Sequence, residues 1–299
     1  MNAPTSKASM AEERDSPDGA EGRSPTQSTL RVIVGQMTSV DDWKSNEEQA
    51  LGLLSKIKDP KTVDLVSFPE NSLFLRLNEK EKMQSVDLSD PIFTRLSKFA
   101  IENKLTIHLG SVPLTAGKKV YNATVLIGPD GKCVDAYNKI HLFDVDISGH
   151  RAYRESDTVE AGDKPSIIEI EGWKFGLTIC YDLRFSNLYA YYARAGVDGI
   201  LVPAAFTVPT GKAHWEVLQR ARAIECQCFV IAAAQDGSHN GKRETYGHSL
   251  VVDPWGHVLA VHGPGQGILD VTLDRAVIER VRSQIPMARH RKGPFDKVN

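Results

Sequence analysis

The chain has 299 residues, of which 41% are hydrophobic and 25% are charged, and its formal net charge is −2. This composition is typical of a globular protein, and the balanced charge argues against a nucleic-acid surface or an acidic binding tail. No apolar run reaches the roughly 18 residues of a membrane span, and the four cysteines lack the spacing of a disulfide framework, so we expect a cytoplasmic protein without a membrane anchor.

Residues 1–29 differ in composition from the rest of the chain. They are rich in Ser, Pro, Gly, Ala and Glu and show no apolar periodicity, which predicts a disordered N-terminal extension. The alternative is a mitochondrial transit peptide, but such peptides avoid acidic residues. This segment contains five of them: Glu12, Glu13, Asp15, Asp18 and Glu21. No low-complexity linker interrupts residues 30–299, which are therefore predicted to form a single domain.

The first half of that domain alternates strands and helices. Two helices are predicted behind capping signals, one at Ser45 with Glu48 and one at Asp90 with Pro91. A Gly-Pro-Asp-Gly turn at 128–131 predicts a hairpin. Strands are predicted at 30–37, 64–68, 105–110, 121–127 and 134–138.

The second half repeats this alternation after a long segment, residues 141–165, that carries little periodicity. A loop of this length is usually functional in a compact domain. Many strands in both halves are apolar on both faces, so we expect an α/β fold in which two sheets pack together under outer helices. Strands are predicted at 173–179, 199–202, 229–234 and 268–272, and helices at 186–195, at 212–225 and from 274.

Cys180 ends a buried predicted strand and opens a turn, so substrate could approach its thiol from above. Glu70 and Lys139 also stand where predicted strands end. Open α/β sheets place their ligands at strand ends, so we expect these three side chains to meet and to support acyl transfer. The remaining cysteines, Cys133, Cys226 and Cys228, lack such surroundings and are expected to be small core residues.

The chemistry expected of this group is nucleophilic. Burial near Phe68 and Phe74 would raise the pKa of Glu70 toward neutral pH and make it a general base. Lys139 would present positive charge to an oxyanion. An unperturbed thiol is a few per cent ionised at pH 7, so activation contributes at most about 2 kcal/mol. A donor to the oxyanion is typically worth about 100- to 1000-fold and should contribute more.

Three segments resemble the signature blocks of the nitrilase (carbon–nitrogen hydrolase) superfamily: Phe-Pro-Glu at 68–70, Asn-Lys-Ile-His-Leu-Phe at 138–143 and Cys-Tyr-Asp-Leu-Arg-Phe at 180–185. Their order and spacing match those of the family, and the similarity extends from about residue 30 to residue 291. The resemblance implies a four-layer α-β-β-α sandwich that pairs with a second subunit through its helices, as a homodimer or homotetramer.

The resemblance also implies the roles of four residues. Glu70, Lys139 and Cys180 match the Glu–Lys–Cys triad of the family, and Glu155 matches its accessory glutamate. Glu70 is then the base, Cys180 attacks a carboxamide and forms a thioester, and Lys139 with a backbone N–H holds the oxyanion. Glu155 orients the substrate amide or the hydrolytic water. No metal or organic cofactor is implied.

The branch of the superfamily is indicated by the residues around these blocks. Tyr-Asp-Leu-Arg follows Cys180 where true nitrilases tend to carry Trp-Glu-Asn, which favours an amidase. Residues 214–225 and 242–249 resemble amidases of deaminated glutathione, a glutathione whose amino group has been oxidised to a ketone. The products would be 2-oxoglutarate and cysteinylglycine, as metabolite repair. The alternatives are an ω-amidase acting on 2-oxoglutaramate and a non-catalytic interaction protein.

Such a substrate carries a carboxylate and an α-keto acid, which basic side chains can bind. Arg184 is expected inside the site or bracing the Cys180 turn, while a pair of basic residues in a later loop either binds substrate or is merely solvated. Three uncharged residues are expected to line the pocket. The predicted substrate contacts are Tyr181, Arg184, Thr207, Lys242, Arg243 and Tyr246.

Overall fold

The computed structural model describes residues 27–78, 81–145 and 153–293. Most of the predicted N-terminal extension therefore lies outside the described residues. Residues 27–29, which composition grouped with that extension, are held in place. Trp173 Nε1 donates a hydrogen bond to the Gln27 carbonyl at 2.9 Å, and the Arg275 N–H donates to the Ser28 carbonyl at 2.9 Å. Residues 27–29 are thus part of the described fold.

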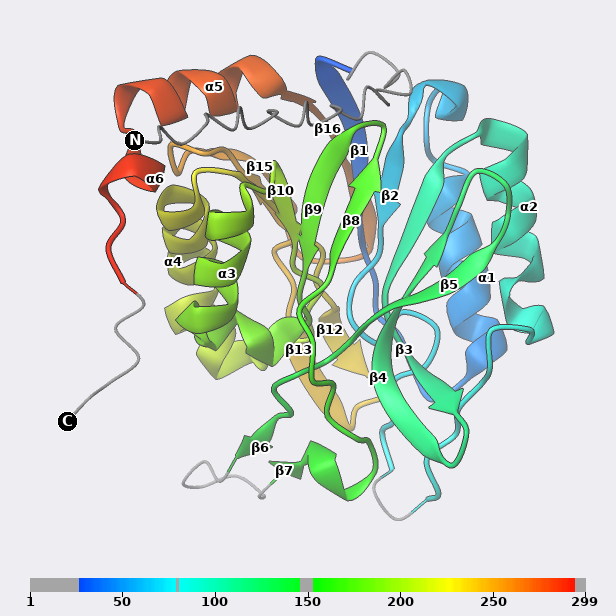
Figure 1. The fold of residues 1–299 in the computed structure, drawn as a ribbon. Helices are drawn as coiled ribbons and strands as arrows, with labels where there is room; N and C mark the ends of the chain where they lie inside the picture. The colour runs from blue at the N-terminus through cyan, green and yellow to red at the C-terminus, as the bar shows by residue number, and fades with distance from the viewer. Residues whose placement is uncertain (1–26, 79–80, 146–152, 294–299) are drawn as a thin grey trace, which may run out of the picture.

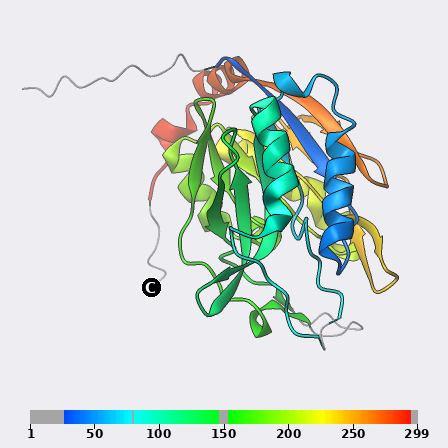
Figure 2. The ribbon, with the colours of Figure 1, turned by 90° about the vertical axis from the view of Figure 1, so that its right-hand side faces the viewer.

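The first of two six-stranded sheets has the strand order β16-β1-β2-β3-β4-β5. Strands β1, β2 and β3 run parallel to one another, and the remaining neighbours pair antiparallel. The strands are β1 (Thr29–Gln36), β2 (Leu65–Ser67), β3 (Thr106–Ala116), β4 (Lys119–Ile127), β5 (Cys133–Asn138) and β16 (Gly267–Asp274). Helices α1 (Trp43–Leu54) and α2 (Thr94–Asn103) lie side by side across its outer face (Figures 1 and 2).

The second sheet has the order β15-β14-β11-β10-β9-β8, with β9, β10 and β11 parallel. Its strands are β8 (Ile167–Ile170), β9 (Trp173–Leu177), β10 (Gly199–Leu201), β11 (Phe229–Ala232), β14 (Leu250–Val252) and β15 (Val258–Val261). Helices α3 (Ser186–Ala195) and α4 (Val208–Cys226) cover its outer face (Figure 1). The arrangement confirms the predicted four-layer α-β-β-α sandwich. In the described part of the chain, no helix is both long and apolar enough to cross a membrane.

Strand β1 explains why many strands have apolar residues on both faces. Leu30, Val32 and Val34 pack in the cluster that also contains core residues of the second sheet, whereas Ile33 packs in the cluster with α1 and α2. All four are fully buried. Because successive side chains of a strand point to opposite faces, the buried part of a strand in an inner layer has apolar residues on both faces.

Several elements differ from their predictions. The cap of α1 is Asp42, whose side chain accepts a hydrogen bond from Ser45 N at 2.7 Å, and not Ser45 itself. Two strands were missed because they are short and polar: β12 (Asp236–His239) and β13 (Arg243–Tyr246), which pair as a hairpin. Strand β8 was missed as the antiparallel neighbour of β9.

The remaining elements are short. The predicted 141–165 loop contains β6 (Asp144–Val145), β7 (Tyr153–Arg154) and the 3-10 turn η3 (Glu155–Asp157), and its residues 146–152 lie outside the described chain. The other 3-10 turns are η1 (Pro60–Thr62), η2 (Pro91–Phe93), which leads into α2, and η4 (Cys180–Arg184). Helices α5 (Arg275–Gln284) and α6 (Met287–His290) follow β16.

Candidate active site

The site lies where the two sheets approach each other at the ends of β2 and β9. A Cβ atom on Gly110 would collide with the Phe68 carbonyl of its own sheet and with Pro203 beside the other sheet, so a side chain here would force them apart. Glu70 follows β2 on one side of this contact. Cys180 follows β9 on the other, and its N–H donates to the Pro203 carbonyl at 2.8 Å. The expected convergence of strand ends therefore occurs across two sheets.

Cys180 begins η4 with an unusual backbone conformation. Its φ angle is +48°, in the left-handed region that non-glycine residues rarely occupy, and the residue is only 8% exposed. Strained residues of this kind persist only where the surrounding structure holds them. We call residues 179–185 the elbow.

Asp182 holds the elbow in place. Its fully buried carboxylate accepts hydrogen bonds from Ile179 N at 2.9 Å, Tyr137 Oη at 2.7 Å and His141 N at 3.0 Å, and contacts His141 Nδ1 at 2.7 Å. Tyr137 and His141 flank Lys139 at the end of β5. One carboxylate therefore ties the segment that carries the lysine to the turn that carries the thiol. This function of Asp182 was not predicted.

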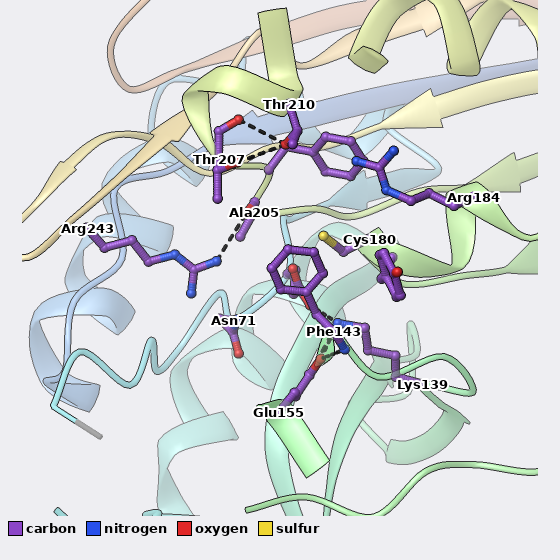
Figure 3. Close-up of a pocket in the computed structure, with 13 residues that line it drawn as sticks. Asn71, Lys139, Phe143, Glu155, Cys180, Arg184, Ala205, Thr207, Thr210 and Arg243 are labelled. Atoms are coloured by element: carbon purple, nitrogen blue, oxygen red, sulfur yellow. Dashed lines mark hydrogen bonds and ion pairs between the residues drawn. The ribbon is translucent and has the colours of Figure 1, made fainter. Parts of the chain in front are cut away.

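The predicted catalytic residues Glu70, Lys139 and Glu155 form one buried group with Asn122, which we call the charge cluster. Figure 3 shows Lys139 and Glu155 side by side in it. Lys139 Nζ donates to Glu70 Oε1 at 2.8 Å and to Glu155 Oε2 at 2.9 Å. Asn122 Nδ2 donates to Glu70 Oε1 at 3.0 Å and to Glu155 Oε1 at 2.8 Å. The exposed fractions range from 2% to 9%. Asn122 was missed, although it is a polar residue in a mainly apolar strand.

The charges of the cluster contradict the expectation that burial raises the pKa of Glu70 toward neutral pH. Burial raises the pKa of Glu70, but the charge and hydrogen bond of Lys139 outweigh it, so the pKa falls below its ordinary value of 4.5. Burial lowers the pKa of Lys139, but Glu155 and Glu70 raise it well above the ordinary value. The pKa of Cys180 is raised well above 9.0 by burial and by the Glu70 charge. At neutral pH the site therefore contains a carboxylate beside a protonated thiol.

A cavity of about 30 Å³ opens beside the Cys180 thiol, with room for about two water molecules. The charge cluster forms one of its walls through Glu70, Lys139 and Glu155. Of the six predicted substrate contacts, four line this cavity: Tyr181, Arg184, Thr207 and Arg243. Further lining residues that were not predicted as contacts are Asn71, Phe143, Phe206 and Thr210.

The two arginines reach the cavity from opposite sides (Figure 3). The Arg184 guanidinium lies over the Phe206 ring at 5.2 Å and contacts His214 Nδ1 at 3.2 Å. Arg243 Nη2 donates to the Ala205 carbonyl at 3.2 Å. Both residues are half-buried. Two cationic side chains therefore line the cavity from different sides.

The other two predicted contacts, Lys242 and Tyr246, do not line this cavity. Lys242 is exposed and pairs with Asp41 at 3.4 Å, and the Tyr246 ring stacks on His248 at 4.1 Å. The reason is the alternation of side chains along β13. Arg243 points to the cavity, so Tyr246, three positions later, points to the opposite face, while Lys242 lies in the turn before the strand. Within the described ranges, no group of three or more His, Cys, Asp or Glu is placed to hold a metal ion.

Known proteins resemble this chain over most of its length. Residues 31–283 match the carbon-nitrogen hydrolase family. Deaminated glutathione amidase of Synechocystis sp. is 43% identical over 267 residues, which cover 86% of this chain and 96% of that protein. The Bos taurus protein of the same name is 38% identical over 268 residues, covering 87% and 81%. The crystal structure of the C. elegans NitFhit protein matches with a TM-score of 0.81 and 33% identity, covering 89% of this chain and 66% of that one. The chain therefore belongs to the carbon-nitrogen hydrolase family and is an enzyme that hydrolyses carbon–nitrogen bonds.

Proposed function

We propose that this enzyme hydrolyses the amide bond of deaminated glutathione through a thioester on Cys180. The observation that carries the proposal is the meeting of Cys180, Glu70 and Lys139 in one cavity with an arginine on either side. Proteins that carry the name deaminated glutathione amidase and are 36–43% identical to this chain support the choice of substrate. The products are cysteinylglycine and 2-oxoglutarate.

The first step forms the thioester. Cys180 Sγ attacks the amide carbon while the Glu70 carboxylate, which hydrogen bonds to this thiol, accepts its proton. The pKa of the thiol is raised and that of Glu70 is lowered, so a free thiolate is not a stable intermediate. Proton transfer therefore accompanies the attack. Glu70 then protonates the leaving nitrogen as the carbon–nitrogen bond breaks, which releases cysteinylglycine.

The oxyanion of the tetrahedral intermediate is stabilised by two donors. Lys139 Nζ donates to Glu70 Oε1 and to both oxygens of Glu155, and we assign one of its three N–H bonds to turn from Glu155 to the oxyanion. The Tyr181 N–H lies in the first turn of η4, where helical N–H groups have no partner within the helix. Donors that are fixed before the reaction stabilise developing charge without reorganisation.

The second step hydrolyses the thioester. Glu70 takes a proton from a water molecule, the water oxygen attacks the carbonyl carbon, and the carbon–sulfur bond breaks. The proton then passes from Glu70 to the departing thiolate. Glu155 accepts hydrogen bonds from Lys139, Asn122 Nδ2 and Phe143 N, which fix its position in the cavity wall. We assign it to orienting the substrate amide or this water.

The arrangement of the arginines favours deaminated glutathione over 2-oxoglutaramate. Both substrates would give the same 2-oxoglutaryl thioester, and they differ in the leaving group, which is a peptide with a carboxylate in one and ammonia in the other. Arg184 and Arg243 on opposite sides can bind one carboxylate at each end of the longer substrate. The shorter amide has an anionic group at one end and would engage a single arginine.

Two measurements identify the nucleophile and the preferred substrate separately. Rapid acid quenching followed by mass spectrometry should show a 2-oxoglutaryl adduct on Cys180 with either amide, and none in Cys180→Ala. The ratio of kcat/KM for the two amides then identifies the substrate, and a higher value for 2-oxoglutaramate would assign an ω-amidase instead. Absence of turnover with every small amide tried would favour a non-catalytic interaction protein.

We also propose that the outer helices mediate assembly into a homodimer or homotetramer. Large apolar side chains are exposed there: Tyr191 on α3 at 46%, and Val217 and Ile224 on α4 at 64% and 47%. Sedimentation equilibrium would measure the assembly, and a monomer at micromolar concentration would contradict it. The four cysteines are free thiols, which supports a reducing, cytoplasmic compartment.

A further inference from the structure

The Arg184 guanidinium is contacted from outside the cavity by a side chain that takes no part in the reaction steps. Arg184 Nη1 lies 3.2 Å from Nδ1 of His214, which is on the second turn of α4. Arg184 lines the cavity beside the Cys180 thiol, whereas His214 does not line it and is exposed. The imidazole is therefore placed to fix the arginine without contacting the substrate.

The direction of this hydrogen bond follows from the chemistry of the two side chains. All five N–H bonds of a guanidinium donate and none of its atoms accepts, so the Nδ1 atom of His214 is the acceptor. A ring nitrogen that carries a proton cannot accept a hydrogen bond. The ring proton of His214 therefore lies on Nε2, and the imidazole is neutral while it holds Arg184.

A neutral acceptor suits an arginine that must bind an anion. Among the described residues, Arg184 contacts the ring faces of Tyr181 at 5.9 Å and Phe206 at 5.2 Å and the His214 nitrogen, but no carboxylate. A carboxylate partner would offset the positive charge of the guanidinium. An imidazole orients the guanidinium and leaves its charge, and the rest of its N–H bonds, for a carboxylate of the substrate.

Helix α4 gives the imidazole a fixed position. The next residue, Trp215, is 1% exposed, and its Nε1 donates to the His248 carbonyl at 2.8 Å. The Trp215 ring also lies 5.0 Å from the ring of Phe206, the same ring over which Arg184 lies. Thr210, one turn earlier in the helix, lines the cavity. The helix that carries His214 is therefore anchored beside the arginine and the cavity wall.

We propose that His214 is a positioning residue of this site, whose Nδ1 atom holds the Arg184 guanidinium toward a carboxylate of the substrate. The inference rests on the proposed function, because it requires an anionic amide as substrate. His214 then acts on substrate binding through Arg184 alone. It has no part in the attack of Cys180 or in proton transfer by Glu70.

Two substitutions of His214 form a matched pair. Asparagine places its Oδ1 atom where histidine has Nδ1 and still accepts a hydrogen bond, whereas leucine places a methyl group there. Leucine is the better helix former, so a role in helix stability alone would favour the leucine variant. Thermal unfolding of both variants checks that they remain folded.

The first measurement is the steady-state kinetics of the pair with deaminated glutathione. His214→Leu should raise KM about fivefold with little change in kcat, because a hydrogen bond of typical net strength is worth about that factor. His214→Asn should keep KM within about twofold of the unmodified enzyme, because the acceptor remains. Equal KM values in the two variants would overturn the role of His214.

A double-mutant cycle tests whether His214 acts through Arg184. Once Arg184→Met has removed the guanidinium, adding His214→Leu should not raise KM further, because there is no longer a group to position. Additive effects of the two substitutions, together with an acyl adduct on Cys180, would overturn the role of His214 and leave the proposed function standing. A missing adduct would overturn the proposed function and this role together.

A spectroscopic test needs no turnover. In protein labelled with ¹⁵N and ¹³C at histidine, the ring shifts of His214 should show the Nε2–H tautomer in mildly alkaline buffer, with His214→Asn identifying the signals. In Arg184→Met this preference should weaken, because the donor to Nδ1 is gone. A Nδ1–H tautomer in the unmodified protein would overturn the inference whatever the substrate.

Discussion

Two walls of the same cavity are built in different ways. In the charge cluster, every ionised group is at most 9% exposed and hydrogen bonds to more than one partner. On the arginine side, Arg184 and Arg243 are half-buried, and they rest on ring faces, an imidazole and a backbone carbonyl. Both walls are charged, but only the first is removed from solvent.

We propose that this difference separates catalysis from substrate binding. Buried charges interact strongly and stay in a fixed geometry, which suits groups that must stabilise a transition state. Half-exposed charges are screened by solvent and can adjust to a ligand. We therefore expect changes in the charge cluster to lower kcat and stability together, and changes on the arginine side to alter mainly KM.

The largest effect is expected for Lys139→Met, which leaves Glu70 and Glu155 buried without a cation. Removing one partner of a buried ion pair costs about 3–5 kcal/mol of unfolding free energy, and we expect kcat/KM to fall about 1000-fold or more. Urea unfolding and steady-state kinetics measure the two effects. The control is Lys119→Met, whose exposed partner Glu160 lies at 3.4 Å and whose loss should cost less than about 1 kcal/mol. Similar losses in both variants would contradict the distinction.

A smaller loss is expected for Asp182→Asn, which keeps the shape of the side chain and replaces an acceptor with a donor. The new NH2 group would face the N–H groups of Ile179 or His141. We expect kcat to fall about 100-fold, with KM little changed, because the elbow shifts relative to Lys139. Asp144→Asn, at an exposed carboxylate that accepts from Ser156, is the control. A change in KM alone would argue against a positioning role.

Substitutions of the two arginines should raise KM. Loss of a charge-assisted hydrogen bond weakens binding by about 1.5–3 kcal/mol, so Arg184→Met and Arg243→Met should each raise KM for deaminated glutathione about 10- to 100-fold. With 2-oxoglutaramate only one of the two variants should have an effect, because that amide carries one carboxylate. Lys242→Met, outside the cavity, should change neither. Equal effects of both arginines on both amides would contradict the two-ended binding.

The smallest effect is the pH dependence. The folded pKa of Glu70 lies below 4.5, so the base stays ionised through the neutral range and kcat/KM should fall, about tenfold per pH unit, only below that pH. Because the pKa of Glu70 is lower in the folded protein than in the unfolded chain, its ionised carboxylate stabilises the fold above the unfolded pKa. This stabilisation is lost as pH falls through the folded pKa. An acid limb centred near pH 6 would show that Lys139 does not control Glu70.

Much of the architecture could be predicted from periodicity. The middle of strand β1 is apolar on both faces because it lies between two layers, and the same pattern in other strands predicted the sandwich. Strands β12 and β13, which were missed, are each four residues long and mainly polar. Their sequences therefore cannot be told from those of loops by hydrophobic periodicity. The convergence of Glu70, Lys139 and Cys180 could be expected because each residue follows a strand.

The sequence by itself thus determined the layers, the family and the chemical groups that meet in the cavity, because apolar spacing and strand ends are local properties. Only the tertiary structure decided the direction of the Glu70 pKa, the bridging position of Asn122 and the separation of Lys242 from Arg243. Glu70 and Lys139 are 69 residues apart along the chain and 2.8 Å apart in space. The energy between two charges depends steeply on distance and burial, and neither quantity exists until the chain has folded.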